Sequence, residues 1–294
     1  QWGMLLAGIG GITMVLGAVL ALCSIDLKRT LACSSVSQIG FILVGLSMQC
    51  LLGHHNALAV DGTILHIVNH SLIKMVLFPA AGVIHLTTHS FDLNQIRGFG
   101  RGKPLLAFIM GVPMLSLAGL PLINGYVSKT LLHESIVEYI HLAPEYGVLF
   151  TGLEWLFLFS GGLTLAYMLK VFVCLFGEKN ALPEKVLEQK WHGPKPYIAP
   201  ATAATMGVYL VGMAVLGMAP NWGMDSLAAV ARSFLHGEGP EHAVAYFSAV
   251  NLRGAAISIV VGSLVYLLVV RRWLIRRGTY IDPIPKWLNL EFGL

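Results

Sequence analysis

Three basic side chains stand four residues apart within one apolar stretch of the sequence: His66, His70 and Lys74. Because a helix turns once in about 3.6 residues, this spacing stacks all three on one helix face, with Asn69 beside them. Histidine titrates near neutral pH, and lysine does so when burial disfavours its charged form. A single histidine there is explained more simply by packing or by a hydrogen bond to a neighbour. The row of three favours the transfer of protons or other ions.

A further lysine, Lys129, follows a stretch that cannot continue as one helix. Pro121 removes a backbone hydrogen bond, and Gly119 and Gly125 loosen the chain on both sides. Unpaired backbone at membrane depth is tolerated only where it faces protein or a water-filled cavity, and broken helices mark transport sites in many carriers. The break and the lysine together favour a transport site over a side chain that merely reaches for the membrane surface.

Three other charged residues have weaker support from the residues alone. Lys28 follows the first apolar stretch, and an ordinary loop charge explains it as well as a site does. Glu154 and Lys170 lie in an apolar stretch of about 28 residues, which is longer than a bilayer requires. We therefore expect both of these side chains to anchor the helix at the two membrane surfaces.

The composition identifies the medium in which these charges lie. The chain of 294 residues is 56% hydrophobic and 12% charged, with a mean hydropathy of +0.73. A soluble domain is about 25% charged, and apolar runs of about 20 residues are the length that crosses a bilayer. The sequence predicts an all-α polytopic membrane helix bundle of about seven transmembrane helices, one of them broken. The predicted spans are 4–23, 31–52, 62–86, 105–139 (broken near 119–125), 149–176, 198–218 and 252–270.

Basic residues alternate between the loops that join these spans. Fourteen Lys and Arg residues fall in alternate loops and two in the others. The positive-inside rule therefore predicts a multi-pass protein of the cell membrane with its N-terminal end outside and its C-terminal end in the cytoplasm. Because the basic residues belong to these loops, the net charge of +4 does not indicate a nucleic-acid partner.

The cysteines give no sign of a metal or disulfide site. They lie within or beside apolar runs and form no CxxC pair, so we expect small buried apolar side chains. They are Cys23, Cys33, Cys50 and Cys174. The sequence predicts no bound metal and no cofactor.

Three segments carry a resemblance to a known family. Residues 26–41 resemble the "DLKRxLAYSTxSQxGY" signature of antiporter-like membrane subunits, which occur in respiratory complex I, Mrp-type sodium/proton antiporters and energy-converting membrane hydrogenases. Residues 66–74 are similar to the family's "HxxxHxxxK", and residues 116–129 to its "SLAGxPPxxGFxSK". All three segments occur in the family's order and spacing.

The resemblance implies a fold and roles for particular residues. It covers residues 1–176, which would form the second of two inverted five-helix repeats, and residues 177–294 would form a further C-terminal membrane region. It implies that Lys28 sits inside the membrane and joins the central proton path. His66 and His70 would lie at the middle of that path with Lys74 close by, and Lys129 at its outer half-channel.

The chain also departs from the family pattern. Cys33 stands in place of the usual tyrosine, and Leu122 in place of a second proline. The family's first repeat, with its paired glutamate and lysine, has no counterpart here. Because the sequence begins at Gln1 and enters an apolar stretch almost at once, with no signal-peptide pattern, we expect the chain to be a piece of a longer polypeptide.

Two functions remain open from the sequence. The first is a non-catalytic, proton-translocating subunit of a redox-driven membrane complex, with other membrane subunits and the lipid bilayer as partners. The second is a subunit of a sodium/proton antiporter without redox chemistry, with sodium as the alternative ion. A haem enzyme is disfavoured, because His66 and His70 lie one turn apart on one helix and cannot clamp a single haem. A purely structural membrane fragment is the remaining interpretation.

Overall fold

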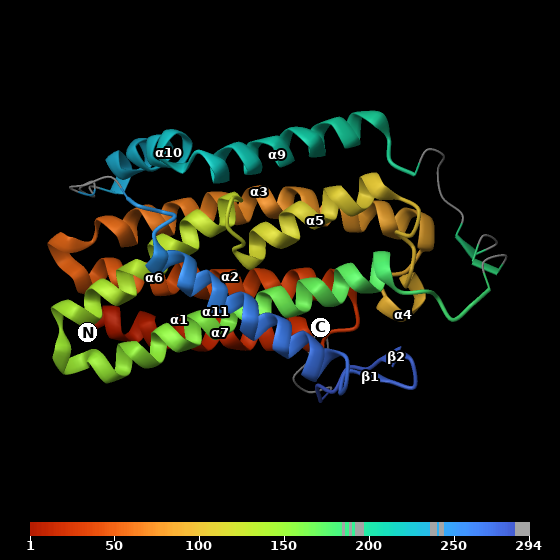
Figure 1. Ribbon diagram of the computed structural model, residues 1–294, viewed down its shortest axis with the longest axis horizontal. Coiled ribbons are helices and arrows are strands. Elements are labelled where there is room, and N and C mark those ends of the chain that lie inside the picture. Colours follow the sequence, from red (N-terminus) through yellow and green to blue (C-terminus); the bar gives the residue numbers. More distant parts are fainter. Residues whose placement is uncertain (184–185, 188–189, 192–196, 236–239, 241–243, 286–294) are drawn as a thin grey trace.

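The computed structural model describes residues 1–183, 186–187, 190–191, 197–235, 240 and 244–285, and this part of the chain is an elongated bundle of helices (Figure 1). The predicted all-α membrane bundle is confirmed, with one small antiparallel hairpin added near the C-terminus. The first half holds α1 (Trp2–Cys23), α2 (Leu27–Leu52), η1 (Gly53–His55), α3 (Ala57–Thr88), α4 (Leu93–Ile96), α5 (Pro104–Ala118) and α6 (Asn124–Leu142). The second half holds η2 (Pro144–Tyr146), α7 (Gly147–Phe172), η3 (Val173–Gly177), α9 (Pro200–Met218), α10 (Pro220–Leu235), α11 (Ala249–Val265), η4 (Tyr266–Val270), β1 (Ile275–Arg276) and β2 (Thr279–Tyr280).

Six helical segments in the described residues are long and apolar enough to cross a membrane. They are α1, α2 with η1, α3, α7 with η2 and η3, α9, and α11 with η4. The remaining predicted span is divided into α5 and α6, which are separated by a turn. The predicted broken helix is therefore confirmed.

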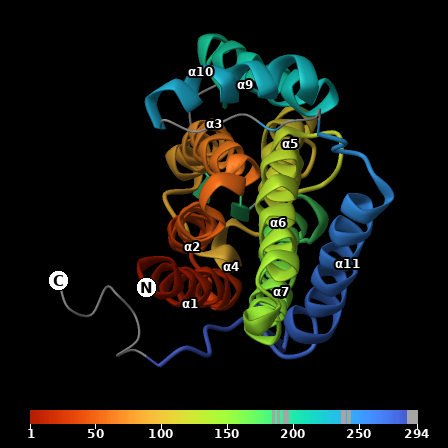
Figure 2. The same cartoon turned by 90° about the vertical axis from the view of Figure 1, so that its left-hand side faces the viewer.

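The helices pack around a central group made of α2, α3, α6 and α7 (Figure 2). α1 lies along α2, and α11 lies against α7. α9 and α10 cover both α3 and the broken helix. The C-terminal helices thus pack on the same bundle as the first five spans. The division into regions 1–176 and 177–294 stays a prediction.

Two large apolar clusters fill the two ends of the bundle. One contains Leu31 and Tyr167, and the other contains Phe41 and Phe157. Between them on α2 and α7 lie fully buried polar residues, among them Gln38 and several serine and threonine side chains. Buried polar groups are costly unless they are hydrogen-bonded, so this layer is the place to look for a site.

Two of the four cysteines match the expectation of burial and one does not. Cys33 and Cys174 are buried and Cys23 is half-buried. Cys50, near the end of α2, is exposed.

Candidate functional site

The break between α5 and α6 contains the residues that predicted it. Gly119 ends α5 with φ of +82°, a left-handed conformation that favours glycine, and Pro121 lies in the following turn. At Gly125, in the first turn of α6, an added Cβ would collide with the carbonyl of Ser116. The broken geometry therefore depends on glycine at both of these positions.

Lys129 lies on the second turn of α6 and reaches back across the break. Its side chain is buried, and its Nζ donates a hydrogen bond of 2.7 Å to the carbonyl oxygen of Leu117, near the end of α5. The same ammonium lies 4.7 Å from the centre of the Phe41 ring. The C-terminal end of a helix carries partial negative charge, so α5 stabilises a cation placed there.

Two asparagines join the broken helix to α3. Asn124 donates to Asn69 Oδ1 at 2.8 Å, and Asn69 donates to the backbone carbonyl of Asn124, also at 2.8 Å. Ser116 on α5 donates to Asn124 Oδ1 at 2.6 Å, and Ser128 accepts a second bond from Asn69 at 3.1 Å. Both halves of the broken helix are thereby held by polar side chains at the level of α3.

His66 connects α3 to two other helices. Its Nδ1 lies 3.0 Å from Ser128 Oγ on α6, and its Nε2 lies 3.1 Å from Gln38 Oε1 on α2. The ring is buried, with 3% of the residue exposed. Because Ser128 directly precedes Lys129 in the chain, His66 and Lys129 meet the same turn of α6.

Lys74 lies at the other end of the row. It is buried and donates to the carbonyl of Leu31 at 2.8 Å and to Ser34 Oγ at 2.5 Å, both on α2. Ser34 and Gln38 are one helical turn apart, and the buried hydroxyl of Tyr167 lies beside both. Buried polar groups therefore extend from Lys74 along α2 to His66 and then to Lys129. We call these groups the buried row. They are Lys74, Ser34, Tyr167, Gln38, His66, Ser128 and Lys129, together with His70.

His70 lies between His66 and Lys74 on α3 and is half-buried. Its Nε2 is buried and has no hydrogen-bond partner among the described residues. The sequence-predicted row on α3 is thus brought to one side of the helix.

Lys28 is not brought to the buried row. It lies on the first turn of α2 with its side chain exposed, while Leu27 and Leu31 on the same helix face the core. Within the described part of the chain, no hydrogen bond or ion pair joins Lys28 to the other candidate residues. The structure therefore does not support the central position that the resemblance implied for Lys28.

The expectation that Lys170 anchors the helix at a membrane surface is wrong. Its side chain is fully buried and donates to three carbonyl oxygens at the end of α1, those of Ala21 at 3.2 Å, Leu22 at 2.5 Å and Ser24 at 2.6 Å. Burial is possible because the unpaired carbonyls of the helix end satisfy the ammonium.

A histidine that sequence reasoning missed lies one turn beyond Lys129. His133 Nε2 is 2.9 Å from Glu154 Oε1 on α7, and the Glu154 side chain is 24% exposed. The signal was available, because Lys129 and His133 repeat the four-residue spacing of His66 and His70.

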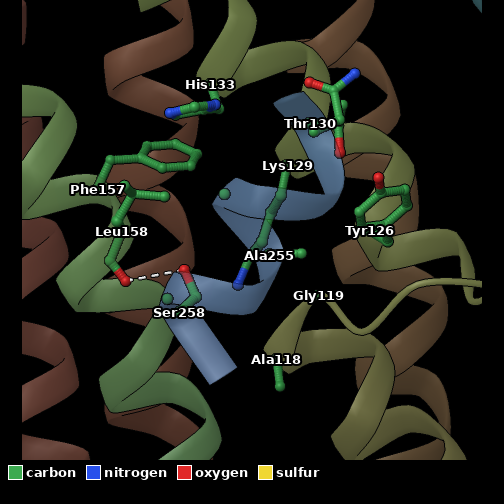
Figure 3. Close-up of a pocket in the computed structure, with 13 residues that line it drawn as sticks. Ala118, Gly119, Tyr126, Lys129, Thr130, His133, Phe157, Leu158, Ala255 and Ser258 are labelled. Atoms are coloured by element: carbon green, nitrogen blue, oxygen red, sulfur yellow. Dashed lines mark hydrogen bonds between the residues drawn. The ribbon is translucent and has the colours of Figure 1, made fainter. Parts of the chain in front are cut away.

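A small cavity opens beside Lys129, between α6, α7 and α11 (Figure 3). Water molecules can be placed in about 40 Å³ of this cavity, which is room for a few of them. The polar side chains that line it are Tyr126, Lys129, Thr130, His133, Asn251 and Ser258.

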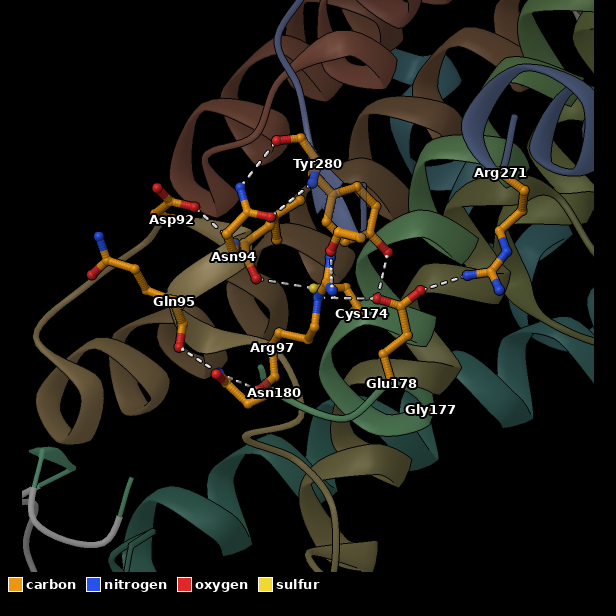
Figure 4. A network of polar contacts seen from close by, with 12 residues as sticks. Asp92, Asn94, Gln95, Arg97, Cys174, Gly177, Glu178, Asn180, Arg271 and Tyr280 are labelled. Atoms are coloured by element: carbon orange, nitrogen blue, oxygen red, sulfur yellow. Dashed lines mark hydrogen bonds and ion pairs between the residues drawn. The ribbon is translucent and has the colours of Figure 1, made fainter. Parts of the chain in front are cut away.

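A second polar cluster ties the C-terminal hairpin to the far end of the bundle (Figure 4). Glu178 pairs with Arg97 at 3.2 Å and with Arg271 at 2.5 Å, and it accepts a hydrogen bond from the Tyr280 hydroxyl at 3.0 Å. Asn94 exchanges two hydrogen bonds with the Tyr280 backbone. Burial raises the pKa of the Tyr280 phenol, which keeps it protonated as a donor to Glu178. This cluster joins segments that are far apart in the sequence, which is typical of a structural role.

Comparison with known proteins gives the family. The family described as NADH:quinone oxidoreductase/Mrp antiporter, transmembrane, matches residues 1–150. A Na(+)/H(+) antiporter subunit of Bacillus subtilis is 32% identical and is matched over 73% of this chain and 27% of its own length. "NADH-ubiquinone oxidoreductase chain 5" of Metridium senile is 29% identical over 71% of this chain and 32% of the relative. "Hydrogenase-4 component B" of Escherichia coli is 35% identical over 44% of this chain and 20% of the relative.

Solved structures agree with this result. The Mrp complex from a Dietzia species contains a chain that matches 92% of this one with a TM-score of 0.70 and 25% identity, over 27% of that chain. A chain of respiratory complex I from Thermus thermophilus shares the fold, with a TM-score of 0.62 and 21% identity over 80% of this chain and 45% of its own length. The chain spans between a fifth and a third of the length of these three curated relatives. This multi-pass membrane chain belongs to the NADH:quinone oxidoreductase/Mrp antiporter transmembrane family, whose relatives are antiporter-like subunits of multi-subunit complexes.

Proposed function

We propose that the chain relays protons through the membrane region of a redox-driven complex, by way of the buried row. Lys74, His70, His66 and Lys129 would hold the proton in turn, with Ser34, Gln38, Tyr167 and Ser128 between them. The other membrane subunits of the complex and the lipid bilayer would be its partners. The N-terminal end would lie outside and the C-terminal end in the cytoplasm, as the loop charges predict.

The observation that carries this proposal is the line of buried titratable and polar groups inside an apolar bundle. His66 contacts Gln38 and Ser128 at 3.1 and 3.0 Å, and Lys74 contacts Ser34 at 2.5 Å. An ionisable group at membrane depth costs about 2.5–3.5 kcal/mol on insertion scales. Several such groups in one row therefore indicate a function that requires them.

Orphaned polar atoms in the row support a role for water. Gln38 Nε2, His70 Nε2 and the Tyr167 hydroxyl are buried and have no hydrogen-bond partner among the described residues. Buried polar groups of this kind are usually satisfied by ordered water. Water at these three atoms would close the gaps between Lys74 and His66.

Electrostatic coupling gives the row a way to pass protons on. Lys129 carries its charge one residue after Ser128, which contacts His66, and Lys74 lies one helical turn from His70. Because like charges disfavour each other, a proton arriving at one site promotes release from the next.

The second candidate is a role in a sodium/proton antiporter without redox chemistry. It is favoured by the Bacillus subtilis relative, which is named as part of a Na(+)/H(+) antiporter, and by the similarity to a chain of a solved Mrp complex. The buried row would serve proton transfer in either setting.

The test uses the whole complex in sealed vesicles and measures proton movement with a pH-sensitive dye. We expect His66→Ala and Lys74→Ala to slow transport about tenfold or more, because each removes a proton-holding group. His55→Ala is the matched control, since that histidine is exposed in η1, just after α2, and should leave the rate unchanged. Wild-type rates in both row variants would refute the proposal. Transport driven by NADH or hydrogen oxidation supports the redox setting, whereas transport driven only by an imposed sodium gradient supports the antiporter setting.

A further inference from the structure

His133 separates two cavities on one side of the bundle. The first is the small cavity beside Lys129. The second, of about 340 Å³, is lined by His133 together with Glu154, His141, Arg253 and Thr151 and by apolar residues of α6, α7 and α11. Both cavities are lined by His133, Leu158 and Gly254, and His133 is the titratable residue among these three.

One ring nitrogen of His133 has a hydrogen-bond partner, and the other has none among the described residues. Its Nε2 lies 2.9 Å from Glu154 Oε1. No hydrogen bond to Nδ1 is present within the described residues, and Gly254 of α11 leaves space there, because an added Cβ would lie 3.6 Å from Nδ1. Phe157 packs against the ring with 6.1 Å between the centroids. One nitrogen is thus paired with a carboxylate, and the other is free to meet water from the Lys129 cavity.

Exposure rises at the end of this line of residues. Lys129 and His133 are both buried, each with 8% of the residue exposed, whereas the side chain of Glu154 is 24% exposed against 11% for the side chain of His133. Glu134 is already engaged, since it accepts a hydrogen bond of 2.6 Å from Asn251. Glu154 is therefore the carboxylate placed to exchange a proton with the ring. The titratable and charged groups around the ring come from three helices: Lys129, Glu134 and His141 of α6, Glu154 of α7 and Arg253 of α11.

We propose that His133 and Glu154 form a proton-transfer pair that connects the Lys129 cavity to the wider cavity. The inference rests on the proposed function and adds the residues through which Lys129 exchanges protons with the surface. A proton from the Lys129 ammonium passes through water to His133 Nδ1, and the proton on Nε2 passes to the Glu154 carboxylate. Glu154 then releases that proton to water in the wider cavity, and rotation of the ring turns the protonated nitrogen towards Glu154 and the unprotonated nitrogen towards the Lys129 cavity, ready for the next proton.

The competing explanation is an ion pair that only ties α6 to α7. Glu154→Gln separates the two, because the amide oxygen still accepts the hydrogen bond from Nε2 but the side chain no longer takes up a proton. A tie between helices would survive this change, and a proton-transfer pair would not.

The experiment measures the rate of proton transport against pH for the whole complex in vesicles. We expect Glu154→Gln and His133→Gln to lower the rate about tenfold, and Glu154→Asp to retain most of it. His133→Ala should regain transport when imidazole is added, because the small molecule fits the space left by the ring. His85→Gln is the control. This half-buried histidine lies in the last turn of α3, where its ring stacks on Phe91.

The outcomes separate this inference from the proposed function. Wild-type rates and pH profiles in Glu154→Gln, with transport lost in Lys129→Ala, overturn the transfer pair and leave the proposed function standing. Wild-type rates in Lys129→Ala as well remove Lys129 from the path and overturn the transfer pair, and wild-type rates in His66→Ala and Lys74→Ala overturn the proposed function too. If His133→Gln lowers the amount of assembled complex, the rate per assembled complex in Glu154→Gln decides, and an unchanged value refutes the inference.

Discussion

Lys129 and Leu117 meet across the gap in a broken helix, where the lysine ammonium donates a hydrogen bond of 2.7 Å to the leucine carbonyl. One carbonyl oxygen and the face of Phe41 are the groups that hold this cation in the described structure. An ammonium has three donors, so this holding is incomplete and leaves donors available to the neighbouring cavity.

The first prediction concerns the charge of Lys129. Lys129→Gln keeps a donor near Leu117 but removes the titratable group, so we expect proton transport by the whole complex to fall about tenfold or more. The measurement is the initial rate in vesicles, normalised to the amount of assembled complex. A normal rate in this variant would remove Lys129 from the proton path.

The second prediction contrasts this residue with Lys170. Lys170→Met leaves the carbonyls of Ala21, Leu22 and Ser24 without their donor, so we expect the complex to lose about 3 kcal/mol of stability. Thermal unfolding of the purified complex measures this loss. Transport per folded complex should stay near the wild-type rate, and a selective loss of transport would contradict the structural role.

The third prediction concerns the close approach at Gly125. Gly125→Ala adds a Cβ that collides with the Ser116 carbonyl, so we expect a lower unfolding temperature and slower transport. Gly82→Ala on α3 is the matched control, because no atom lies within 4 Å of the added Cβ. Alanine is favoured over glycine inside a helix by about 0.5–1 kcal/mol, so the control should be neutral or slightly stabilising. Equal behaviour of the two variants would contradict the packing described at the break.

The fourth prediction concerns the paired amides of Asn69 and Asn124. One hydrogen bond joins the two side chains, and the other ends on the backbone carbonyl of Asn124, which alanine keeps. A double-mutant cycle of Asn69→Ala and Asn124→Ala should therefore give a coupling of about 1 kcal/mol from the bond between the side chains. Unfolding free energies of the four proteins give the coupling. Additive effects of the two substitutions would show that the pair does not hold the broken helix to α3.

The fifth prediction concerns pH and Tyr280. Burial raises the pKa of this phenol, so its contribution to stability is complete at lower pH and is lost as pH rises above about 10. Tyr280→Phe removes the hydrogen bond to Glu178 and should cost about 1 kcal/mol at neutral pH. The difference in unfolding temperature between wild type and variant should narrow as pH rises from about 8 to about 11. A constant difference over that range would contradict the raised pKa.

Local patterns in the sequence predicted much of the site. The four-residue spacing of His66, His70 and Lys74 fixes their common helix face, and Pro121 flanked by Gly119 and Gly125 favours a break in a helix. The row and the break could therefore be predicted, since both depend on residues close together in the chain.

Contacts between distant segments could not be predicted in this way. Lys170 meets the end of α1 only because α7 packs beside it, across 146 or more residues of sequence. The Glu178 cluster joins α4, the end of α7 and the C-terminal hairpin in the same manner. The role of Lys28 stays a prediction of the resemblance, because a matching motif does not say which side of α2 faces the core and this side chain is exposed.

The distance between His66 and Lys74 along α3 has an electrical consequence. From His66 to Lys74 the helix rises about 12 Å, which is about 40% of a hydrocarbon core of about 30 Å. A charge that crosses a full membrane potential of about 100 mV does about 2.3 kcal/mol of work, so movement along this part of α3 accounts for about 1 kcal/mol. Proton transfer between these two residues would therefore respond to voltage as well as to the pH difference.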